Sequence, residues 1–298
     1  MKVIRTISGL RQELNSLKQT RKDGGSVGLV PTMGFLHAGH ASLMTRAREM
    51  SDTVVLSIFV NPIQFGPGED YETYPRDEER DLALAERHGI DIVFIPTVQE
   101  MYPKQVKTKI VVSELTSLLC GASRPGHFDG VTTVVSKLIN IIKPNRAFFG
   151  LKDAQQVAVL QQMVTDLNLD VEIIPCPIIR EKDGLALSSR NVYLSQEERT
   201  QALILSRSLN DVREAMNCGK ATTAAEARLM LNEIIHSAPL AVIEYAEVLS
   251  FPELSRVEDD TLLVDLQGQV IMALAVKFGK TRLIDNLLFT PKEVLSLV

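Results

Sequence analysis

The segment Pro31-Thr-Met-Gly-Phe-Leu-His-Ala-Gly-His40 carries the residue types of this sequence best suited to chemistry. Gly34 and Gly39 permit tight turns and close approach of the backbone to a ligand. His37 and His40 are three residues apart, so on a helix both can face the same point. A helix N-terminus attracts anions, and two imidazoles there suit a polyphosphate whose charge shifts during a reaction. The segment predicts a phosphate site; the alternative is an ordinary strand–turn–helix with two surface histidines.

Neutral amide side chains follow two of the expected strands. Asn61 and Gln64 lie in the segment Asn61-Pro-Ile-Gln-Phe-Gly66, and Gln156 stands one turn into an expected helix. Such side chains can hydrogen-bond a hydroxyl, amide or carboxylate of a substrate without adding charge. The alternative for the first segment is a loop in which the polar side chains cap backbone groups.

Basic and hydroxyl side chains form two further candidate phosphate contacts. Gly150 allows close backbone approach, Lys152 offers a compact positive charge, and Asp153 either caps the next helix or orients Lys152. In Leu187-Ser-Ser-Arg190, two hydroxyls and a guanidinium can clamp a polyphosphate, or they form a polar linker. Gly279-Lys-Thr281 is not a Walker loop, because Leu274 occupies the position of its first glycine.

An acidic cluster at the start of an expected helix includes candidate magnesium ligands. Magnesium usually takes few protein carboxylates together with phosphate oxygens and water, so one aspartate is enough. Carboxylates in this position also stabilise the helix dipole, which is the alternative for most of the cluster. Arg124–Gly130 is a glycine-rich basic stretch that we interpret as a candidate mobile lid. The acidic candidates are Asp77, Glu78, Glu79 and Asp81.

Elements of alternating type must position these residues. Short continuous apolar runs separated by segments with helical spacing predict a parallel sheet covered on both faces, which is a Rossmann-like doubly wound α/β fold. Such folds bind ligands at the carboxyl ends of their strands. The expected strands are Ser26–Pro31, Thr53–Phe59, Asp91–Ile95, Arg146–Phe149 and Val171–Ile174, and the expected helices are Ser42–Met50, Arg76–His88, Val131–Ile142 and Ala154–Leu167.

The pattern changes after Arg180 and predicts a smaller C-terminal α+β domain. We therefore expect one domain over residues 1–180 and a second, able to close as a lid, over residues 181–298. Capping boxes at Ser195–Glu198 and Thr223–Glu226 predict two helix starts. Strands are expected at Ile243–Leu249, Thr261–Leu266 and Val270–Val276.

Composition restricts the partners and the compartment. A formal net charge of −5 over 298 residues argues against nucleic acid as the main partner. The cysteines Cys120, Cys176 and Cys218 are widely spaced and form no CxxC pair, which favours reduced thiols in a reducing compartment. Charges interrupt the N-terminal segment, and no apolar run reaches the roughly 18 residues of a membrane span, so we expect a cytoplasmic protein without a membrane partner.

Taken together, the motifs resemble those of the pantothenate synthetase family, in the nucleotidyltransferase superfamily with an HxGH motif. The stretches PTMGFLHAGH, VNPIQFGPGEDYETYPR, RPGHFDGVTTVVSKL, FFGLKDAQQ and GLALSSRNVYLS stand in the family's order and spacing, from about Val27 to Ser195, and EYAEVL fits as well. The resemblance implies a ligase that uses ATP and Mg²⁺ to condense (R)-pantoate with β-alanine through a pantoyl adenylate. It also implies release of AMP and pyrophosphate, and a homodimer.

The resemblance further assigns roles to individual residues. It implies that His40 is an acid catalyst beside His37, that Lys152 and Arg190 act on the phosphates, and that Asp81 binds magnesium. Gln64 and Gln156 are implied to bind pantoate, and we add Asn61 and Arg124 as candidate substrate contacts. Leu151 departs from the polar residue that relatives often carry there. The implied ATP contacts are Met33, Gly34, Phe35, Leu36, His37, Ala38, Gly39, His40, Gly150, Leu151, Lys152, Asp153, Ile179, Leu187, Ser188, Ser189 and Arg190.

Two other functions compete with the ligase. A nucleotidyltransferase of the same superfamily would keep the nucleotide on its product, and the amide pair Gln64 and Gln156 counts against it. A regulatory module would bind nucleotide without turnover, and the full set of basic and histidine residues counts against that. Released AMP would support the ligase.

Overall fold

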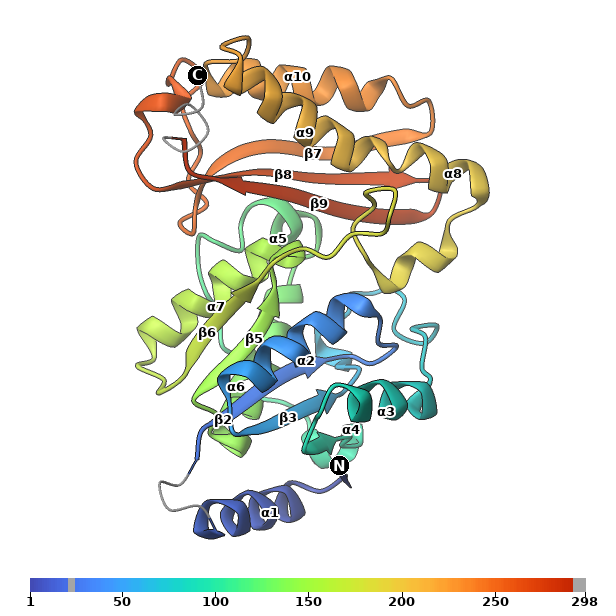
Figure 1. Cartoon of the computed structure of the whole chain (residues 1–298), viewed down its shortest axis with the longest axis vertical. Helices are drawn as coiled ribbons and strands as arrows, with labels where there is room; N and C mark the ends of the chain where they lie inside the picture. The colour runs from blue at the N-terminus through green and yellow to red at the C-terminus, as the bar shows by residue number, and fades with distance from the viewer. Residues whose placement is uncertain (21–24, 292–298) are drawn as a thin grey trace. The chain divides into compact units, whose positions relative to one another are not determined.

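The computed structural model describes residues 1–20 and 25–291, which divide into two compact units (Figure 1). The first unit comprises Met1–Leu151 and Val159–Ile178, and the second comprises Lys152–Ala158 and Ile179–Val298. Among the described residues, no helix has both the length and the apolarity that a bilayer crossing requires.

The first unit is built on a six-stranded parallel sheet with the order β1-β4-β3-β2-β5-β6. All five expected strands are confirmed, and the fold class with them. The additional strand β1 is mostly exposed and begins with a lysine, so it shows no continuous apolar run. The strands are β1 (Lys2–Ile4), β2 (Val27–Thr32), β3 (Thr53–Ile58), β4 (Ile92–Phe94), β5 (Arg146–Gly150) and β6 (Glu172–Cys176).

Helices connect these strands, and the four expected helices are confirmed. Two of them begin one turn earlier than predicted, because each first turn contains a glycine and a histidine that obscure the apolar spacing. Three further helices, α1, α4 and α5, were not predicted. The helices are α1 (Ile7–Thr20), α2 (Ala38–Met50), α3 (Glu78–Arg87), α4 (Val98–Met101), α5 (Leu119–Ser123), α6 (His127–Ile142) and α7 (Ala154–Asp166).

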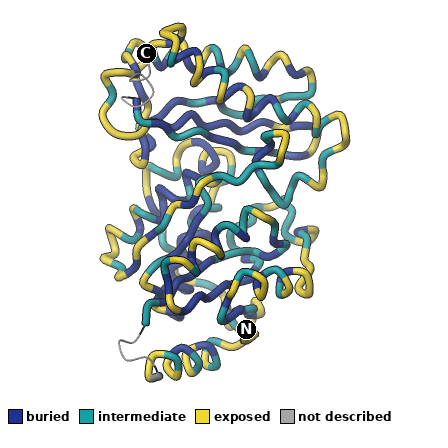
Figure 2. Tube along the Cα trace, in the orientation of Figure 1, coloured by how far each residue is buried: buried dark blue, intermediate teal, exposed yellow. Residues whose placement is uncertain are grey.

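Both faces of the parallel sheet are covered. Successive side chains of a strand point to opposite faces. Val30 and Leu56 belong to a core cluster with Met44 of α2, whereas their strand neighbours Leu29 and Val55 point to the other face, and all five are fully buried. The first four residues of β2 and all residues of β3 are buried, and much of this sheet is dark blue in Figure 2. This double coverage explains why the strands read as unbroken apolar runs in the sequence.

The strand order reverses between β2 and β5. Strands β3 and β4 continue the sheet on one side of β2, and β5 and β6 continue it on the other. Pairing between β2 and β5 covers Gly28–Leu29 and Arg146–Ala147, although β2 extends to Thr32 and β5 to Gly150. The two strands therefore separate toward their carboxyl ends. In α/β sheets such a topological switch point is where ligands bind.

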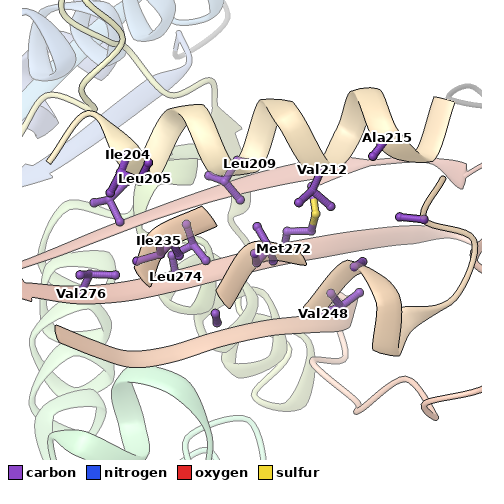
Figure 3. Packing of buried hydrophobic residues seen from close by; sticks show 14 of the residues in the cluster. Ile204, Leu205, Leu209, Val212, Ala215, Ile235, Val248, Met272, Leu274 and Val276 are labelled. Atoms are coloured by element: carbon purple, nitrogen blue, oxygen red, sulfur yellow. The ribbon is translucent and has the colours of Figure 1, made fainter. Parts of the chain in front are cut away.

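The second unit packs helices on a three-stranded antiparallel sheet with the order β7-β8-β9. Figure 3 shows Leu209 and Val212 of α9 facing Met272 and Leu274 of β8 in its core. The expected helix starts at Ser195 and Thr223 are confirmed as capping boxes. The elements are α8 (Gln196–Gln201), α9 (Ile204–Asn217), α10 (Ala224–His236), β7 (Ala241–Phe251), β8 (Gln269–Phe278) and β9 (Thr281–Phe289).

Two strand predictions in this unit need correction. The expected strand Thr261–Leu266 is wrong: it contains a short 3-10 helix at Leu263–Asp265, in which Leu263 is buried while Leu262 and Val264 remain exposed. Strand β9 was missed. Its apolar pattern is interrupted by Asp285 and Asn286, which are nevertheless buried.

Candidate active site

The two histidines of the segment Met33–His40, here called the histidine loop, define the start of α2. His37 is the N-cap residue, and its Nδ1 accepts a hydrogen bond from the amide of Gly39 at 3.1 Å. The amide of His37 donates to Nδ1 of His40 at 3.3 Å, and the two ring centroids are 4.1 Å apart. Because each Nδ1 accepts a backbone proton, each neutral ring carries its own proton on Nε2. The structure thus places two imidazoles together at a helix N-terminus after β2.

Asp81 holds the backbone of the histidine loop. Its Oδ2 accepts from the amide of Phe35 at 2.8 Å and its Oδ1 from the amide of Leu36 at 2.6 Å, and the residue is 1% exposed. Burial raises the pKa of the Asp81 carboxyl, and the bonds from Leu36 and Phe35 offset part of this increase. Gly34 has φ +83°, and a Cβ there would lie 3.0 Å from Oδ2 of Asp81. Both conditions favour glycine at this position.

The assignment of magnesium to Asp81 stays a prediction. Both oxygens of Asp81 already accept backbone protons, and the side chain is buried. The described residues contain no group of three or more His, Cys, Asp or Glu side chains that could hold a metal ion. The other acidic candidates open α3, where Asp77 caps the amide of Arg80 at 3.1 Å. The residues of the described chain therefore do not form a protein-ligand cage for magnesium.

The two amide side chains after β3, those of Asn61 and Gln64, differ in burial. Asn61 is 1% exposed, and its Nδ2 donates to the carbonyl of Gly130 at 3.1 Å and to Oε1 of Gln64 at 3.0 Å. Gln64 is half-buried, and its Nε2 donates to Sδ of Met33 at 3.2 Å. This contact brings Gln64 to the histidine loop, as expected for two parts of one site. Asn61 contacts Gln64 rather than pointing outward, so the geometry does not favour its predicted direct contact with substrate.

The stretch Arg124–Gly130 is not the loop that a mobile lid requires. His127 begins α6, and Gly130 lies in the first turn of this helix, where a Cβ would come within 2.5 Å of the backbone of Ile63 and Gln64. Arg124 forms a two-bonded ion pair with Glu69, with both N–O distances at 2.7 Å. The hydrogen bond from Arg124 lowers the pKa of Glu69 to about 2 despite its partial burial. The mobile lid stays a prediction for this stretch, and the helix start and the ion pair count against it.

Lys152 and Gln156 belong to the second unit. Lys152 lies in a short 3-10 helix, Leu151–Asp153, and its Nζ is 3.6 Å from Oδ2 of Asp153. Asp153 is thus an ion-pair partner of the lysine, and its two predicted roles, capping the next helix and orienting Lys152, stay predictions. The backbone carbonyl of Lys152 accepts from Nδ2 of Asn286 on β9 at 3.0 Å. Gln156 is half-buried on α7.

The segment Ile179–Arg190, here called the junction segment, brings two predicted ATP contacts side by side. The amide of Leu187 donates to the carbonyl of Ile179 at 3.0 Å, and Oγ of Ser188 accepts from the amide of Arg190 at 3.2 Å. Arg180 anchors the segment through two bonds to the buried Asp285, at 2.6 and 2.9 Å. The half-buried residues Ser189 and Arg190 open a 3-10 helix, Ser189–Tyr193.

Supporting residues such as Tyr102, Arg180, Asp285 and Asn286 were not predicted. For Asp285 and Asn286 the sequence does contain a signal, because two adjacent polar residues interrupt an apolar strand pattern and must find buried partners. Tyr102 donates its hydroxyl to Oδ1 of Asn61 at 2.8 Å, across 41 residues of sequence. No residue spacing identifies a partner at that separation.

A glycine-containing loop and a histidine-capped helix start, placed at the switch point of a doubly wound sheet, are the arrangement of α/β enzymes that bind nucleotides. The chain belongs to the pantoate–β-alanine ligase family, whose model matches residues 2–288. It is 55% identical to the pantothenate synthetase of Acetivibrio thermocellus, over 97% of this chain and 99% of that protein. It is 54% identical to the enzyme of the same name from Pelotomaculum thermopropionicum, over 96% and 98% of the two chains.

Solved structures agree with this assignment. The crystal structure of pantothenate synthetase from Thermus thermophilus superimposes with a TM-score of 0.87 at 44% identity, covering 99% of this chain and 100% of that chain. A pantoate–β-alanine ligase from Francisella tularensis, complexed with β-γ ATP and β-alanine, gives a TM-score of 0.76 at 33% identity, covering 98% of each chain.

Proposed function

We propose that this chain condenses (R)-pantoate with β-alanine at the expense of ATP, forming pantothenate, AMP and pyrophosphate through a pantoyl adenylate. The observation that carries this function is the family match, which extends over residues 2–288 and so includes every predicted site residue. The structure of the Francisella tularensis relative with β-γ ATP and β-alanine supports ATP and the amine as substrates. The paired imidazoles of the histidine loop supply groups suited to the phosphates.

The first half-reaction activates the acid. A carboxylate oxygen of pantoate attacks the α-phosphorus of ATP, the bond from that phosphorus to the bridging oxygen breaks, and pyrophosphate leaves with the electron pair. Negative charge develops on phosphate oxygens during this step, and cationic or proton-donating groups lower its barrier. We assign this role to His40 and His37, each with a proton on Nε2 when neutral, and to Lys152 and Arg190.

The second half-reaction forms the amide. The amine nitrogen of β-alanine attacks the acyl carbon, the carbon–oxygen bond to the phosphate breaks, AMP leaves, and the nitrogen releases its proton to solvent. The site must hold pantoate through both steps and exclude water, which would hydrolyse the adenylate. We assign the acid to the amides of Gln64 and Gln156. Arg124, whose guanidinium is engaged by Glu69, would act on substrate only if that ion pair opened.

The ATP contacts are proposed on the segments that the resemblance names. The histidine loop, Gly150–Asp153, Ile179 and Leu187–Arg190 would share the nucleotide. Within the histidine loop, the amides of Phe35 and Leu36 donate to Asp81, so any contact that these residues make with ATP would use other atoms.

Magnesium, assembly and compartment are proposed from the family resemblance. Magnesium would neutralise phosphate charge, held by the phosphate oxygens and water because the described residues offer it no cage. We derive no step through the ion. A homodimer and a cytoplasmic location are also proposed; the reduced form of Cys120, Cys176 and Cys218 supports a reducing compartment. Light scattering after size-exclusion chromatography tests the dimer.

Product analysis tests the proposed function. Purified protein is incubated with ATP, Mg²⁺, pantoate and β-alanine, and each substrate is omitted in turn. Pantothenate, AMP and pyrophosphate in equal amounts are the expected products. A nucleotide retained on the product would favour a nucleotidyltransferase, and ATP binding without β-alanine-dependent AMP release would favour a module without turnover.

Isotope exchange tests the order of the two half-reactions. If the adenylate forms first, labelled pyrophosphate enters ATP when pantoate and Mg²⁺ are present and β-alanine is absent. Omitting pantoate should abolish the exchange. If no exchange occurs, either the reaction is concerted or pyrophosphate stays bound until β-alanine arrives. Rapid quench distinguishes these cases, because pantoyl adenylate accumulates only when pyrophosphate stays bound.

A further inference from the structure

A chain of hydrogen bonds runs from a tyrosine into the proposed pantoate site. The hydroxyl of Tyr102 contacts Oδ1 of Asn61 at 2.8 Å, and Nδ2 of Asn61 contacts Oε1 of Gln64 at 3.0 Å. Nε2 of Gln64 then contacts Sδ of Met33, in the histidine loop, at 3.2 Å. Asn61, the central member, is 1% exposed, so its polar atoms depend on these partners rather than on water.

A backbone carbonyl fixes the direction of this chain. The carbonyl oxygen of Gly130, 3.1 Å from the Asn61 side chain, can only accept a hydrogen bond. The Asn61 atom that faces Gly130 and Gln64 must therefore be Nδ2, and the opposite atom is Oδ1. Because Nδ2 only donates, the Gln64 atom that faces it is Oε1. The remaining atom of the Gln64 amide is Nε2, a donor.

The same logic gives Tyr102 its role. Oδ1 of Asn61 can only accept, so the phenol of Tyr102 must donate to it. Burial raises the pKa of the Tyr102 phenol, which keeps that proton in place. The ring is held by Phe59, with centroids 6.0 Å apart, and by Lys137, whose Nζ lies 5.2 Å from the ring centroid. Without the hydroxyl, the buried Oδ1 would have no donor and Asn61 would be drawn away from Gly130 and Gln64.

We propose that Tyr102 is a positioning residue, which acts through Asn61 to hold the Gln64 amide so that its NH₂ group is presented to the acid substrate. The proposal rests on the proposed function, in which Gln64 binds pantoate. It specifies the polarity of that contact: Gln64 donates to an accepting oxygen of the substrate, either a carboxylate or a hydroxyl oxygen. Tyr102 itself does not touch substrate.

The substitution Tyr102→Phe tests the proposal, because it removes the hydroxyl and keeps the ring between Phe59 and Lys137. We expect the KM for pantoate to rise by about five- to tenfold, the effect of one misplaced substrate hydrogen bond, with the KM for ATP changed by less than about twofold. The matched control is Tyr245→Phe, which removes the hydroxyl of another half-buried tyrosine, in the second unit, and should leave both constants unchanged. Thermal unfolding of each variant establishes that it is folded.

A double-mutant cycle separates positioning from general destabilisation. If Tyr102 acts through Gln64, then Tyr102→Phe should change the KM for pantoate by less than about twofold when Gln64 is already alanine. An additive effect in the Gln64→Ala background, or equal increases in the KM for ATP and for pantoate, would overturn the positioning role while leaving the proposed function intact. Absence of pantothenate with the unmodified protein would overturn both.

Discussion

Two of the segments proposed to hold ATP, the histidine loop and the junction segment, are fixed by different kinds of interaction. In the histidine loop, the fully buried Asp81 accepts two backbone amides, and no ion pair is involved in these bonds. In the junction segment, ion pairs provide the support: Arg180 binds Asp285, and Arg199 binds Glu181 at 2.9 Å and Asp183 at 2.7 Å. Burial shields the contacts of Asp81 from salt, whereas salt can screen much of the ion pairing in the junction segment. The histidine loop should therefore keep its geometry under conditions that loosen the junction segment.

The largest effect is expected from removing the chemistry of the histidine loop without removing its support. His40→Ala should lower kcat by about 10²–10⁴-fold, the contribution of general acid and electrostatic groups. Because Asp81 still holds the loop, circular dichroism and the unfolding midpoint should stay close to those of the unmodified protein. His88→Ala is the matched control, since His88 contacts Thr45 and lies outside the proposed site. A loss below about fivefold would remove His40 from the proposed mechanism.

Removing the support of the histidine loop should affect both activity and stability. Asp81→Asn places an NH₂ group against one of the two backbone amides, so one amide loses its acceptor. We expect the free energy of unfolding to fall by about 1–3 kcal/mol, and kcat/KM for ATP to fall by about 10–100-fold. Asp77→Asn is the control on the same helix, because asparagine caps a helix about as well as aspartate. If both variants behave alike, Asp81 is not needed to hold the loop.

The ion pair between Glu69 and Arg124 lies in the first unit, as the histidine loop does. It therefore tests whether the sensitivity of a contact to solution conditions depends on the type of interaction or on the unit that contains it. The pKa of Glu69 is lowered from 4.5 to about 2, so its stabilisation is complete above about pH 4.5 and is lost as the pH falls toward 2. With the Glu69 side chain 25% exposed, we expect Glu69→Gln to lower the free energy of unfolding at pH 7 by about 2 kcal/mol.

Urea unfolding between pH 7 and pH 2.5 checks this expectation. The difference between Glu69→Gln and the unmodified protein should shrink as the pH falls through that window. Glu72→Gln, which changes a nearby exposed carboxylate, provides the control. A difference that stays constant with pH would mean that the charge of Glu69 contributes little and that the substitution acts through packing.

The parallel sheet and the candidate chemical groups could be predicted from the sequence, but the contacts that hold these groups in place could not. Strands such as β2 and β3 are buried on both faces, so their apolar runs identify them directly. Asp81 was recognised as a candidate yet interpreted as a metal ligand, because its partners are backbone amides 45 and 46 residues away. Because every residue except proline has a backbone N–H, residue types do not show which amide a side chain will bind. Tyr102 was missed for a different reason: its partner is a side chain, that of Asn61, but it lies 41 residues away in the sequence.

The smallest effect is expected where the junction segment is most open to solvent. The Arg199 side chain is 24% exposed and its partners Glu181 and Asp183 are 35% and 44% exposed, so water and salt screen these pairs. Arg199→Gln should lower the free energy of unfolding by about 0–1 kcal/mol at low salt, and by less in 1 M NaCl. The KM for ATP should rise by no more than about twofold, because the pair of Arg180 with the buried Asp285 still anchors the segment. The matched control is Arg207→Gln, in which a more exposed arginine loses its Asp211 partner on α9.

The KM for ATP would contradict this expectation if it rose tenfold or more at low salt and if neither added salt nor a lower temperature reversed the rise. Such a result would show that the junction segment depends on Arg199 as closely as the histidine loop is expected to depend on Asp81. The contrast between a shielded and a salt-sensitive support would then no longer hold.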